Sequence, residues 1–277
     1  MRDAINQRYP ASPRALFASL WHNRELIVQL TQREVMSRYR GSVLGLAWSF
    51  FNPLLMLAVY TFVFSVIFKA RWGLEQESTT DFAIVVFVGL IIHGLLAECL
   101  NRAPGLILTN VNYVKKVVFP LEILPWVAAG SALFHSAVSI AVLLAAQLVF
   151  QHALAWTVVF LPIVLVPLLF ATMGLAWFLS SIGVYVRDIG QTIGIFTLVL
   201  LFLSPVFYPV DALSENYRFL LLLNPLTPVI EDARRVLIWH QTPDWAKLTL
   251  YAAADFGVAW LGFWWFQRTR RGFADVV

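Results

Sequence analysis

The sequence has very little charge and almost no cysteine, and both shortages narrow the class of protein. Cys99 is the only cysteine among 277 residues, which excludes a disulfide within the chain. Asp, Glu, Lys and Arg make up only 13% of the residues, whereas they make up about a quarter of a typical soluble domain. So few charges point away from a soluble fold and toward a membrane protein.

Several catalytic motifs are also absent. The sequence has no glycine-rich phosphate-binding loop, no His-Glu-x-x-His or paired-cysteine metal spacing, and no Gly-x-Ser-x-Gly turn. His93 and His135 lie in apolar stretches without a second ligand at metal spacing, and we interpret each as a structural histidine. We therefore predict no catalytic residue, no metal site and no cofactor in this chain. The net charge of +4 comes from basic residues beside apolar runs, which favours contact with membrane lipids over a nucleic-acid partner.

Six long apolar stretches occupy most of the chain. A helix that crosses the hydrocarbon core of a bilayer needs about 20 mostly apolar residues. The first stretch follows a long arginine-rich leader and exceeds the apolar part of a signal peptide, so we expect an uncleaved span. We predict an all-α integral membrane protein with six transmembrane helices. The predicted spans are Val43–Phe68, Phe82–Ala103, Leu121–Leu148, Leu154–Gly183, Ile189–Val210 and Leu248–Gln267.

The basic residues predict the orientation of these spans. Of the 20 Lys and Arg residues, 14 fall in segments on one side of the predicted spans and 6 on the other. Because loops rich in basic residues stay in the cytoplasm, both termini are predicted to be cytoplasmic. The chain then divides into a cytoplasmic N-terminal segment (1–42), one six-span domain (43–267) and a cytoplasmic tail (268–277).

The segment before the first span looks helical. The apolar residues between Leu16 and Trp21 share one arc of a helix, as in a helix that lies in the plane of the headgroups. Farther on the pattern weakens, because Leu30, Arg33 and Arg40 share one face while Val35 lies opposite. A face that mixes Leu with Arg fits a cytosolic protein partner as well as lipid, and the sequence leaves both open.

The linker from Asn101 to Pro125 is the longest internal segment predicted to be cytoplasmic. It has a short apolar turn at Leu106–Leu108 and then carries Lys115 and Lys116. A short helix there suits docking to a cytosolic partner. A positively charged loop that only sets topology fits the same composition.

The segment before the last predicted span is apolar but interrupted. Asn224-Pro225-Leu226-Thr227-Pro228 is followed by four charged residues at 231, 232, 234 and 235. So many charges are costly at bilayer depth. We therefore predict two short helices that dip into the outer leaflet or pack across the mouth of the bundle, where they suit a gate.

Two stripes of aromatic and polar residues lie along predicted spans one and five. A polar Asn52 on a face of aromatic residues is costly against lipid and indicates that this face looks into protein or a lumen. Aromatic faces and hydroxyls suit a sugar, but such stripes also occur in ordinary helix packing. The candidate lining residues are Trp48, Phe51, Asn52 and Phe62 on span one, with Phe196, Thr197, Ser204, Phe207 and Tyr208 on span five.

Two acids also fall within or near the spans. Glu98 lies near the inner end of span two and Asp255 in the outer half of span six. An ionisable residue in a membrane is a functional candidate. Pairing within the bundle and a proton relay both fit these positions, and there is no chain of acids to pass protons along.

Several motifs together resemble a known family. The run Arg33 to Pro53 closely resembles the start of the first span in membrane subunits of polysaccharide-exporting ABC transporters, and above all in O-antigen (lipopolysaccharide) export permeases. Capsule and teichoic-acid permeases are relatives of these. Asn110 to Pro125, Tyr185 to Asp188 and Asn224 to Pro228 are similar to further family motifs, in the family's order.

The resemblance implies a function and partners. Such a subunit has six spans, pairs with a second copy of itself in the bacterial inner membrane, and exports lipid-linked polysaccharide. A separate cytosolic ATPase dimer binds ATP and Mg, which agrees with the missing phosphate-binding loop. The contacts with the ATPase are implied at Arg33, Arg40, Leu106, Ile107, Tyr113, Val114, Lys115 and Lys116. The outer gate is implied at Asn224, Pro225, Pro228, Glu231 and Arg234.

Three other functions fit parts of the sequence less well. A membrane enzyme such as a glycosyltransferase would need paired acids facing one compartment, and the acids here are dispersed. A secondary transporter usually shows an internal repeat, and no two halves are evident. An ABC exporter of a smaller molecule is the closest rival, and the sequence leaves open which polysaccharide is carried.

Overall fold

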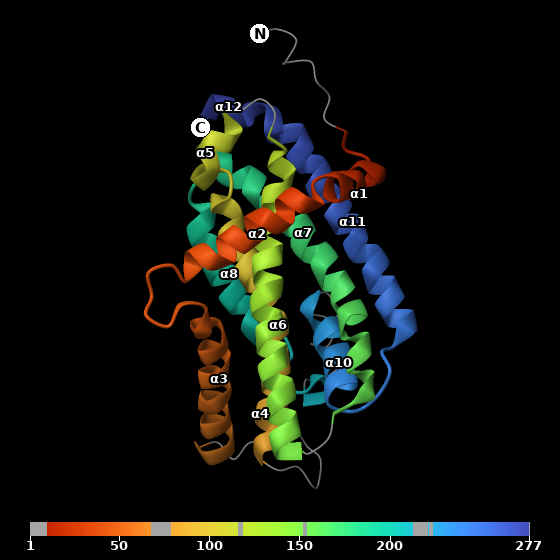
Figure 1. Ribbon diagram of the computed structural model, residues 1–277. Helices are drawn as coiled ribbons and strands as arrows, with labels where there is room; N and C mark the ends of the chain where they lie inside the picture. Colours follow the sequence, from red (N-terminus) through yellow and green to blue (C-terminus); the bar gives the residue numbers. More distant parts are fainter. Residues whose placement is uncertain are drawn as a thin grey trace.

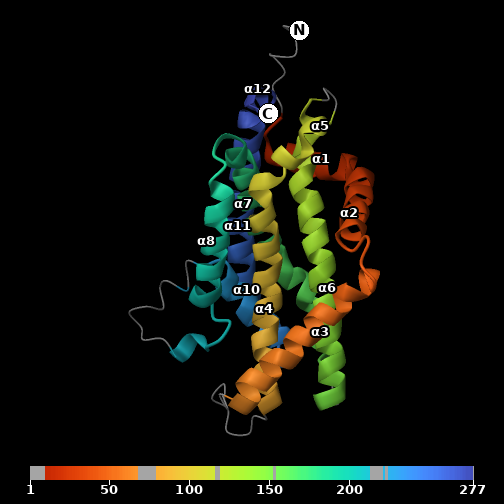
Figure 2. The same ribbon diagram turned by 90° about the vertical axis from the view of Figure 1, so that its left-hand side faces the viewer.

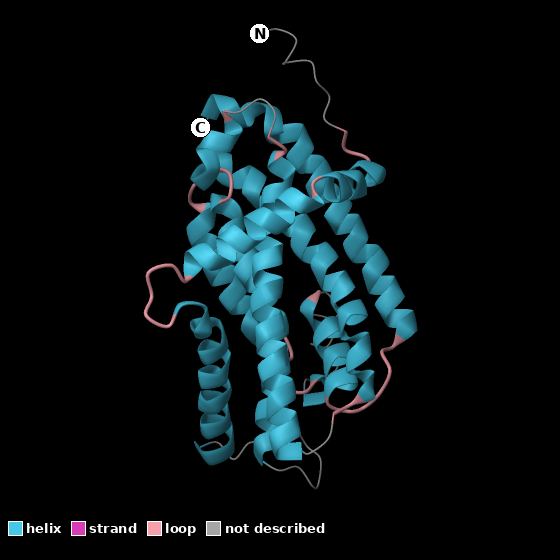
Figure 3. Ribbon diagram, in the orientation of Figure 1, coloured by secondary structure: helices cyan, strands magenta, loops and turns pink. Residues whose placement is uncertain are grey.

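The computed structural model describes residues 10–67, 79–115, 119–151, 154–212, 221 and 224–276. Within these ranges the chain is almost entirely helical and contains no strand (Figure 3). The long helices form a bundle in which all but α3 run roughly along one direction (Figures 1 and 2). They are α3 (Trp48–Thr61, continued by a π-helix at Phe62–Ile67), α4 (Thr79–Arg102), α6 (Leu124–Gln151), α7 (Leu161–Tyr185), α8 (Ile189–Leu203) and α11 (Trp245–Thr269).

Four of these helical segments are long and apolar enough to cross a membrane. They are Gly45–Phe64, Phe82–Gly105, Leu121–Phe150 and Trp156–Tyr185, which correspond to the first four predicted spans. At 15 residues, α8 reaches only about 22 Å, less than the hydrocarbon core of a bilayer. α11 has 25 residues, but its Trp, Tyr and Gly residues make it less apolar.

The fifth predicted span is too long at its C-terminal end. The prediction extended it to Val210, whereas α8 ends at Leu203. Pro205 has no backbone N–H and disfavours helical geometry at the residue before it. The chain turns at residues 204–206 and continues as the 3-10 helix Val210–Ala212.

α7 forms the centre of the bundle. Sixteen of its 25 residues are buried, and it packs along α11, α4, α6 and α10. Trp177 of α7 is fully buried, and its Nε1 donates to the carbonyl of Glu122 at 3.0 Å. The contact with α11 is close because Gly174 and Gly262 meet backbone to backbone. α7 is therefore the helix against which the others are positioned.

α3 lies at the edge of the bundle. Figure 2 shows it crossing α4 and α6 at a clear angle. Only Pro53 and Leu57 are buried along α3, while large apolar side chains such as Phe51 and Phe62 are about half exposed. In a membrane protein, such a face contacts lipid or another subunit.

α1 (Pro13–His22) and α2 (Arg24–Arg38) lie across one end of the bundle (Figures 1 and 2). Two short helices, α5 (Val111–Val114) and α12 (Phe273–Val276), lie at the same end. Ser12 caps α1 by accepting from the N–H of Ala15 at 3.2 Å. Leu16 is buried, and Phe17 stacks on Phe256 with 5.7 Å between ring centroids. The apolar arc of α1 is thus divided between the bundle and its surroundings.

α2 packs on the bundle through the face that carries Val35. Ile27 and Val35 are the buried residues, and Thr31 between them sits on Gly130 of α6, where a β-carbon would not fit. The sequence placed Val35 opposite the face with Leu30 and Arg33. The structure agrees with this division, because Arg33 is exposed and the face with Val35 packs on the glycine notch of α6, which the pattern of α2 does not report.

α10 (Leu226–Leu237) is a short helix buried inside the bundle against α4, α7 and Trp156–Phe160. Its last carbonyls would lack partners in an apolar environment. Thr157 Oγ1 donates to the carbonyl of Val236 at 2.6 Å, and Gln147 Nε2 donates to that of Leu237 at 2.8 Å. The sequence analysis missed both polar anchors. The remaining 3-10 helices are Gly45–Ala47, Ala103–Gly105, Leu108–Asn110, Leu121–Ile123 and Arg270–Gly272.

Candidate functional site

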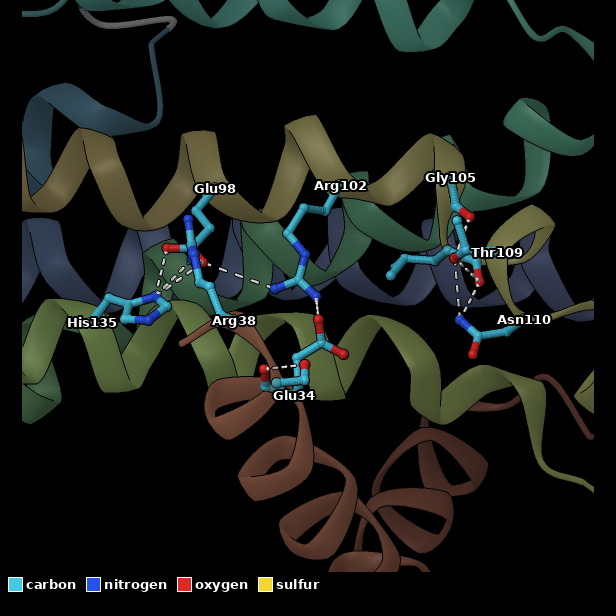
Figure 4. A network of polar contacts seen from close by, with 10 residues as sticks. Glu34, Arg38, Glu98, Arg102, Gly105, Thr109, Asn110 and His135 are labelled. Atoms are coloured by element: carbon cyan, nitrogen blue, oxygen red, sulfur yellow. Dashed lines mark hydrogen bonds and ion pairs between the residues drawn. The ribbon is translucent and has the colours of Figure 1, made fainter. Parts of the chain in front are cut away.

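A cluster of charged side chains lies where α2, α4 and α6 meet (Figure 4). At its centre, Glu98 Oε1 lies 2.5 Å from Arg38 Nη1, and both carboxylate oxygens lie 3.0 Å from His135 Nδ1. Arg102, one turn along α4, lies 3.9 Å from Glu98 and pairs with Glu34 of α2. We call these five residues the α2 anchor, because they join α2 to the two long helices.

Tyr39 extends the α2 anchor from the end of α2. Its hydroxyl lies 3.1 Å from His135 Nε2. Burial raises the pKa of the Tyr39 phenol above its usual value, so the hydroxyl keeps its proton. Because the ionised carboxylate of Glu98 only accepts hydrogen bonds, His135 Nδ1 donates to it and Nε2 accepts from Tyr39. The arrangement suits a structural anchor, since it satisfies Glu98 locally and reaches the second acid, Glu34, only through the guanidinium of Arg102.

The other ionisable residues noted in the sequence lie elsewhere. His93 Nε2 lies 2.9 Å from the carbonyl of Thr197, so it joins α4 to α8. Asp255 is buried on α11 and has no hydrogen bond or ion pair with any residue that the structure describes. The sequence pointed to Glu98 and Asp255 but missed Arg38. A weak signal was present, because Glu98 and Arg102 are four residues apart on one helix.

Glu98→Ala is expected to lower the free energy of unfolding by about 2–3 kcal/mol, because it leaves Arg38 and His135 without their carboxylate partner. Thermal unfolding of the purified protein in detergent measures the change. Glu25→Ala is the matched control. Its pair with Arg24, 3.7 Å apart, has a glutamate side chain that is 83% exposed, and the loss is expected to stay under about 1 kcal/mol. Equal melting temperatures for the two variants would contradict the anchor.

A cavity of about 470 Å³ lies beside the α2 anchor, between α3, α4 and α6. Two predicted lining residues of span one, Trp48 and Asn52, line it. Phe51 and Phe62 do not; they lie on a neighbouring face of α3 and are 46% and 57% exposed. The predicted stripe is therefore divided between the cavity and an outer surface.

The predicted stripe of span five is also divided. Thr197 and Ser204 are buried in helix packing rather than open to a lumen: Thr197 bonds Asn101, and Ser204 accepts from Asn224 at 2.8 Å. Each hydroxyl also donates to its own helix, which satisfies it without a ligand. The remaining members are Phe196, which is exposed; Phe207, which packs on Phe64 and Phe202; and Tyr208, whose hydroxyl donates to the carbonyl of Phe202 at 3.1 Å.

The predicted ATPase-contact residues are only partly accessible. Leu106 and Ile107 are buried in the core, so the apolar turn faces inward, and a role for these two residues in ATPase coupling stays a prediction. Tyr113 stacks on Phe119, with ring centroids 4.1 Å apart. Lys116 lies outside the described residues. The side chain of Val114 is half-buried, whereas Arg33, Arg40 and Lys115 are exposed.

The predicted gate residues are mostly internal. Asn224 Oδ1 accepts from the N–H of Leu226 at 3.0 Å, and Asn224 Nδ2 donates to Ser204, so Asn224 joins the end of α8 to the start of α10. Arg234 is fully buried, with Nη1 3.1 Å from Glu231. The sequence placed Arg234 at an outer mouth, and the structure places it inside the packing. Pro225, Pro228 and Glu231 are half-buried.

Comparison with known proteins identifies the family. The profile of the ABC-2 type transporter matches residues 25–238, which is most of the chain. The chain belongs to the ABC-2 type transporter family. It is 28% identical to the O-antigen export system permease protein RfbA of Myxococcus xanthus, over 95% of this chain and 99% of that protein. It is 22% identical to RfbA of Klebsiella pneumoniae (91% and 95%) and 23% identical to the polysialic acid transport protein KpsM of Escherichia coli (74% and 78%).

These relatives confirm the resemblance to polysaccharide-export permeases. An ABC-2 permease is a membrane subunit of an ABC transporter and not itself the ATPase. The described residues of this permease contain no group of three His, Cys, Asp or Glu side chains that could hold a metal ion. The cavity and the α2 anchor are thus features of a transport subunit.

Proposed function

We propose that this permease exports lipid-linked polysaccharide of the O-antigen type across the bacterial inner membrane, driven by a separate ATPase. The observation that carries the proposal is the match over nearly the full length of proteins named O-antigen export permeases. The match to the polysialic acid transport protein supports an alternative, in which the same machinery carries capsular polysaccharide. Teichoic acid and a smaller molecule are further alternatives for the transported substrate.

The proposed assembly is a homodimer with both termini in the cytoplasm and six spans in each subunit. Exposed apolar side chains on α3 and α8, such as Phe51 and Phe202, support a second copy or lipid as the neighbour of these helices. α8 and α11 serve as the fifth and sixth spans in this proposal. Phe51, Phe62 and Phe196 then face the polymer path or the subunit interface, and α10 supports the outer gate.

ATP and Mg are bound by the partner ATPase in this proposal. The exposed cytoplasmic surface for it consists of Arg33 on α2, Arg40 just after α2 and Lys115 after α5. α5 lies at the bundle end that carries α1 and α12, and α2 crosses the bundle from α1 (Figure 1). An acidic surface on the ATPase would complement them.

Transport of radiolabelled lipid-linked glycan into inverted membrane vesicles tests the function. Uptake is expected only when the permease, a co-expressed cytosolic ATPase subunit and ATP are all present. Uptake without the ATPase, or ATP hydrolysis by the purified permease alone, would overturn the proposal. Competition by capsular polysaccharide on its lipid carrier separates the two substrates.

Lys115→Glu is expected to weaken ATPase binding by about tenfold, because the reversed charge meets a surface complementary to Lys. Lys247→Glu, on an exposed lysine at the other end of the bundle, is the matched control and should bind the ATPase normally. Co-purification at a series of salt concentrations measures both. Equal retention of the ATPase would leave Lys115 as a residue that only sets topology.

A further inference from the structure

We propose that the cavity between α3, α4 and α6 binds the phosphate-linked sugar end of a lipid-linked glycan within a single subunit. The inference rests on the proposed function and names the place where the substrate is first held. The cavity is also lined by Arg38, Tyr60, Gly94 and Ser136, which the sequence did not predict as lining residues.

The cavity has the size and the mixture of walls that such a ligand needs. Its volume of about 470 Å³ falls within the range of about 300–1,000 Å³ typical of small-molecule sites. Trp48 and Tyr60 contribute aromatic rings from α3, and Phe87 and Ile91 contribute apolar surface from α4. Aromatic faces stack on the C–H faces of sugars, and the apolar surface suits the start of a lipid chain.

Two polar side chains on the cavity wall have no partner. Ser136 is 7% exposed and Asn52 is exposed, and neither forms a hydrogen bond with any described residue. A hydroxyl or amide without a partner is costly at membrane depth, where little water is present to bind it. The hydroxyls of a sugar can both donate and accept, so they would supply hydrogen-bond partners for Ser136 and for Asn52.

One end of the cavity carries charge. Arg38 and Glu98 line this end, together with His135. Arg38 Nη1 donates to Glu98 and lies 3.2 Å from His135 Nδ1. Nε and Nη2 of its half-exposed guanidinium form no hydrogen bond with any residue that the structure describes. A guanidinium fork is well matched to phosphate oxygens. The nearby Glu98 carboxylate would accept from sugar hydroxyls, and it disfavours a ligand that offers only a phosphate.

These features favour a sugar phosphate on a lipid over an ordinary phospholipid. A phospholipid offers a phosphate and an apolar tail, but few hydroxyls for Asn52, Ser136 and the open face of Trp48. The lipid-linked glycan offers all three kinds of group in sequence: tail, phosphate and sugar. Its tail would leave the cavity past α3, which has few buried residues along its length.

Gly94 provides a sharp test, because it lines the cavity and a β-carbon there meets nothing within 4 Å. Gly94→Leu fills the cavity without forcing the backbone to move. Gly257→Leu is the matched control, since a β-carbon at Gly257 of α11 also meets nothing within 4 Å and Gly257 is remote from the cavity walls. The probe is a radiolabelled polyprenyl-phosphate hexose added to the full-length permease in lipid nanodiscs.

Gly94→Leu is expected to weaken binding of this probe by about tenfold or more, while Gly257→Leu binds like the unchanged protein. Ser136→Ala should weaken binding by a smaller factor without filling the cavity. An excess of phosphatidylglycerol or of polyprenyl phosphate without sugar should displace little of the probe.

Each other outcome counts against the inference. Equal binding by Gly94→Leu and Gly257→Leu would place the ligand elsewhere, and displacement by phosphatidylglycerol would make the cavity an ordinary lipid site. Export of lipid-linked glycan into vesicles by the unchanged permease and its ATPase distinguishes a failure of the cavity assignment from a failure of the proposed function. If export occurs but Gly94→Leu exports normally, the cavity assignment fails and the proposed function stands; if no export occurs, the proposed function itself fails.

Discussion

Arg234→Met is expected to lower the free energy of unfolding by about 3–5 kcal/mol, the range for removing one partner of a buried ion pair. The Arg234 side chain is fully buried. Its Nε donates to the carbonyl of Val85 at 3.2 Å, its Nη2 donates to that of Val206 at 3.0 Å, and its Nη1 pairs with Glu231 at 3.1 Å. Methionine fills a similar volume but leaves two carbonyls and a half-buried carboxylate without their donor.

Arg235→Met is the matched control for this prediction. The neighbouring Arg235 side chain is 37% exposed and lies 3.9 Å from Asp232, so its loss is expected to cost under about 1 kcal/mol. Thermal unfolding in detergent compares the two variants. Arg234→Lys is expected to fall near Arg234→Met, because one ammonium cannot reach the three acceptors that the guanidinium fork serves. A melting temperature of Arg234→Met equal to that of Arg235→Met would show that the buried network is not stabilising.

Arg234 also shows where the sequence-based prediction fails. The cost of a charge at bilayer depth correctly predicted that the segment around it does not span the membrane. The position of Arg234 at an outer gate stays a prediction, but the sequence did not show that its side chain is fully buried. The compensating acceptors come from α4 and from the turn after α8, and no local pattern reports them. Gly89 adds to the fit, because a β-carbon there would lie 3.2 Å from Arg234 Nη2.

The long apolar runs were predictable because their signal is local. The four membrane-length helices follow the first four predicted spans closely, since hydropathy over about 20 residues is a property of the sequence alone. The end of α8 was predicted less well. Pro205 is visible in the sequence, but the apolar run continues past it to Val206 and Phe207, so hydropathy alone does not mark the end of α8 at Leu203.

The candidate site was predictable only where one residue carried the signal. Glu98 was noted because it is an acid in an apolar run, yet its partner Arg38 lies 60 residues away on another helix. Leu106 and Ile107 form a short apolar turn in a cytoplasmic linker, and the sequence does not show that this turn directs both side chains into the core. Thr197 looked like a lining residue because a hydroxyl on a helix face is ambiguous until its neighbour Asn101 is known.

Gly262→Val is expected to separate α7 from α11 and to lower the free energy of unfolding by about 3 kcal/mol or more, at or above the upper end of ordinary overpacking. A β-carbon on Gly262 would overlap the carbonyl of Gly174, and one on Gly174 would overlap that of Val258. Both obstacles are backbone atoms, which cannot turn aside as a flexible side chain can. Small residues at such a contact let two membrane helices approach closely.

Gly257→Val on the same helix is the control, because a β-carbon at Gly257 meets nothing within 4 Å. Both variants exchange glycine for the same residue in a helix interior, so their effects on helix propensity are alike and the difference between them reports the contact. The yield of monodisperse protein in detergent and its melting temperature are the measurements. Gly262→Val should lose most of the monodisperse fraction while Gly257→Val keeps it. A Gly262→Val protein as stable as its control would mean that the close approach of α7 and α11 does not stabilise the bundle.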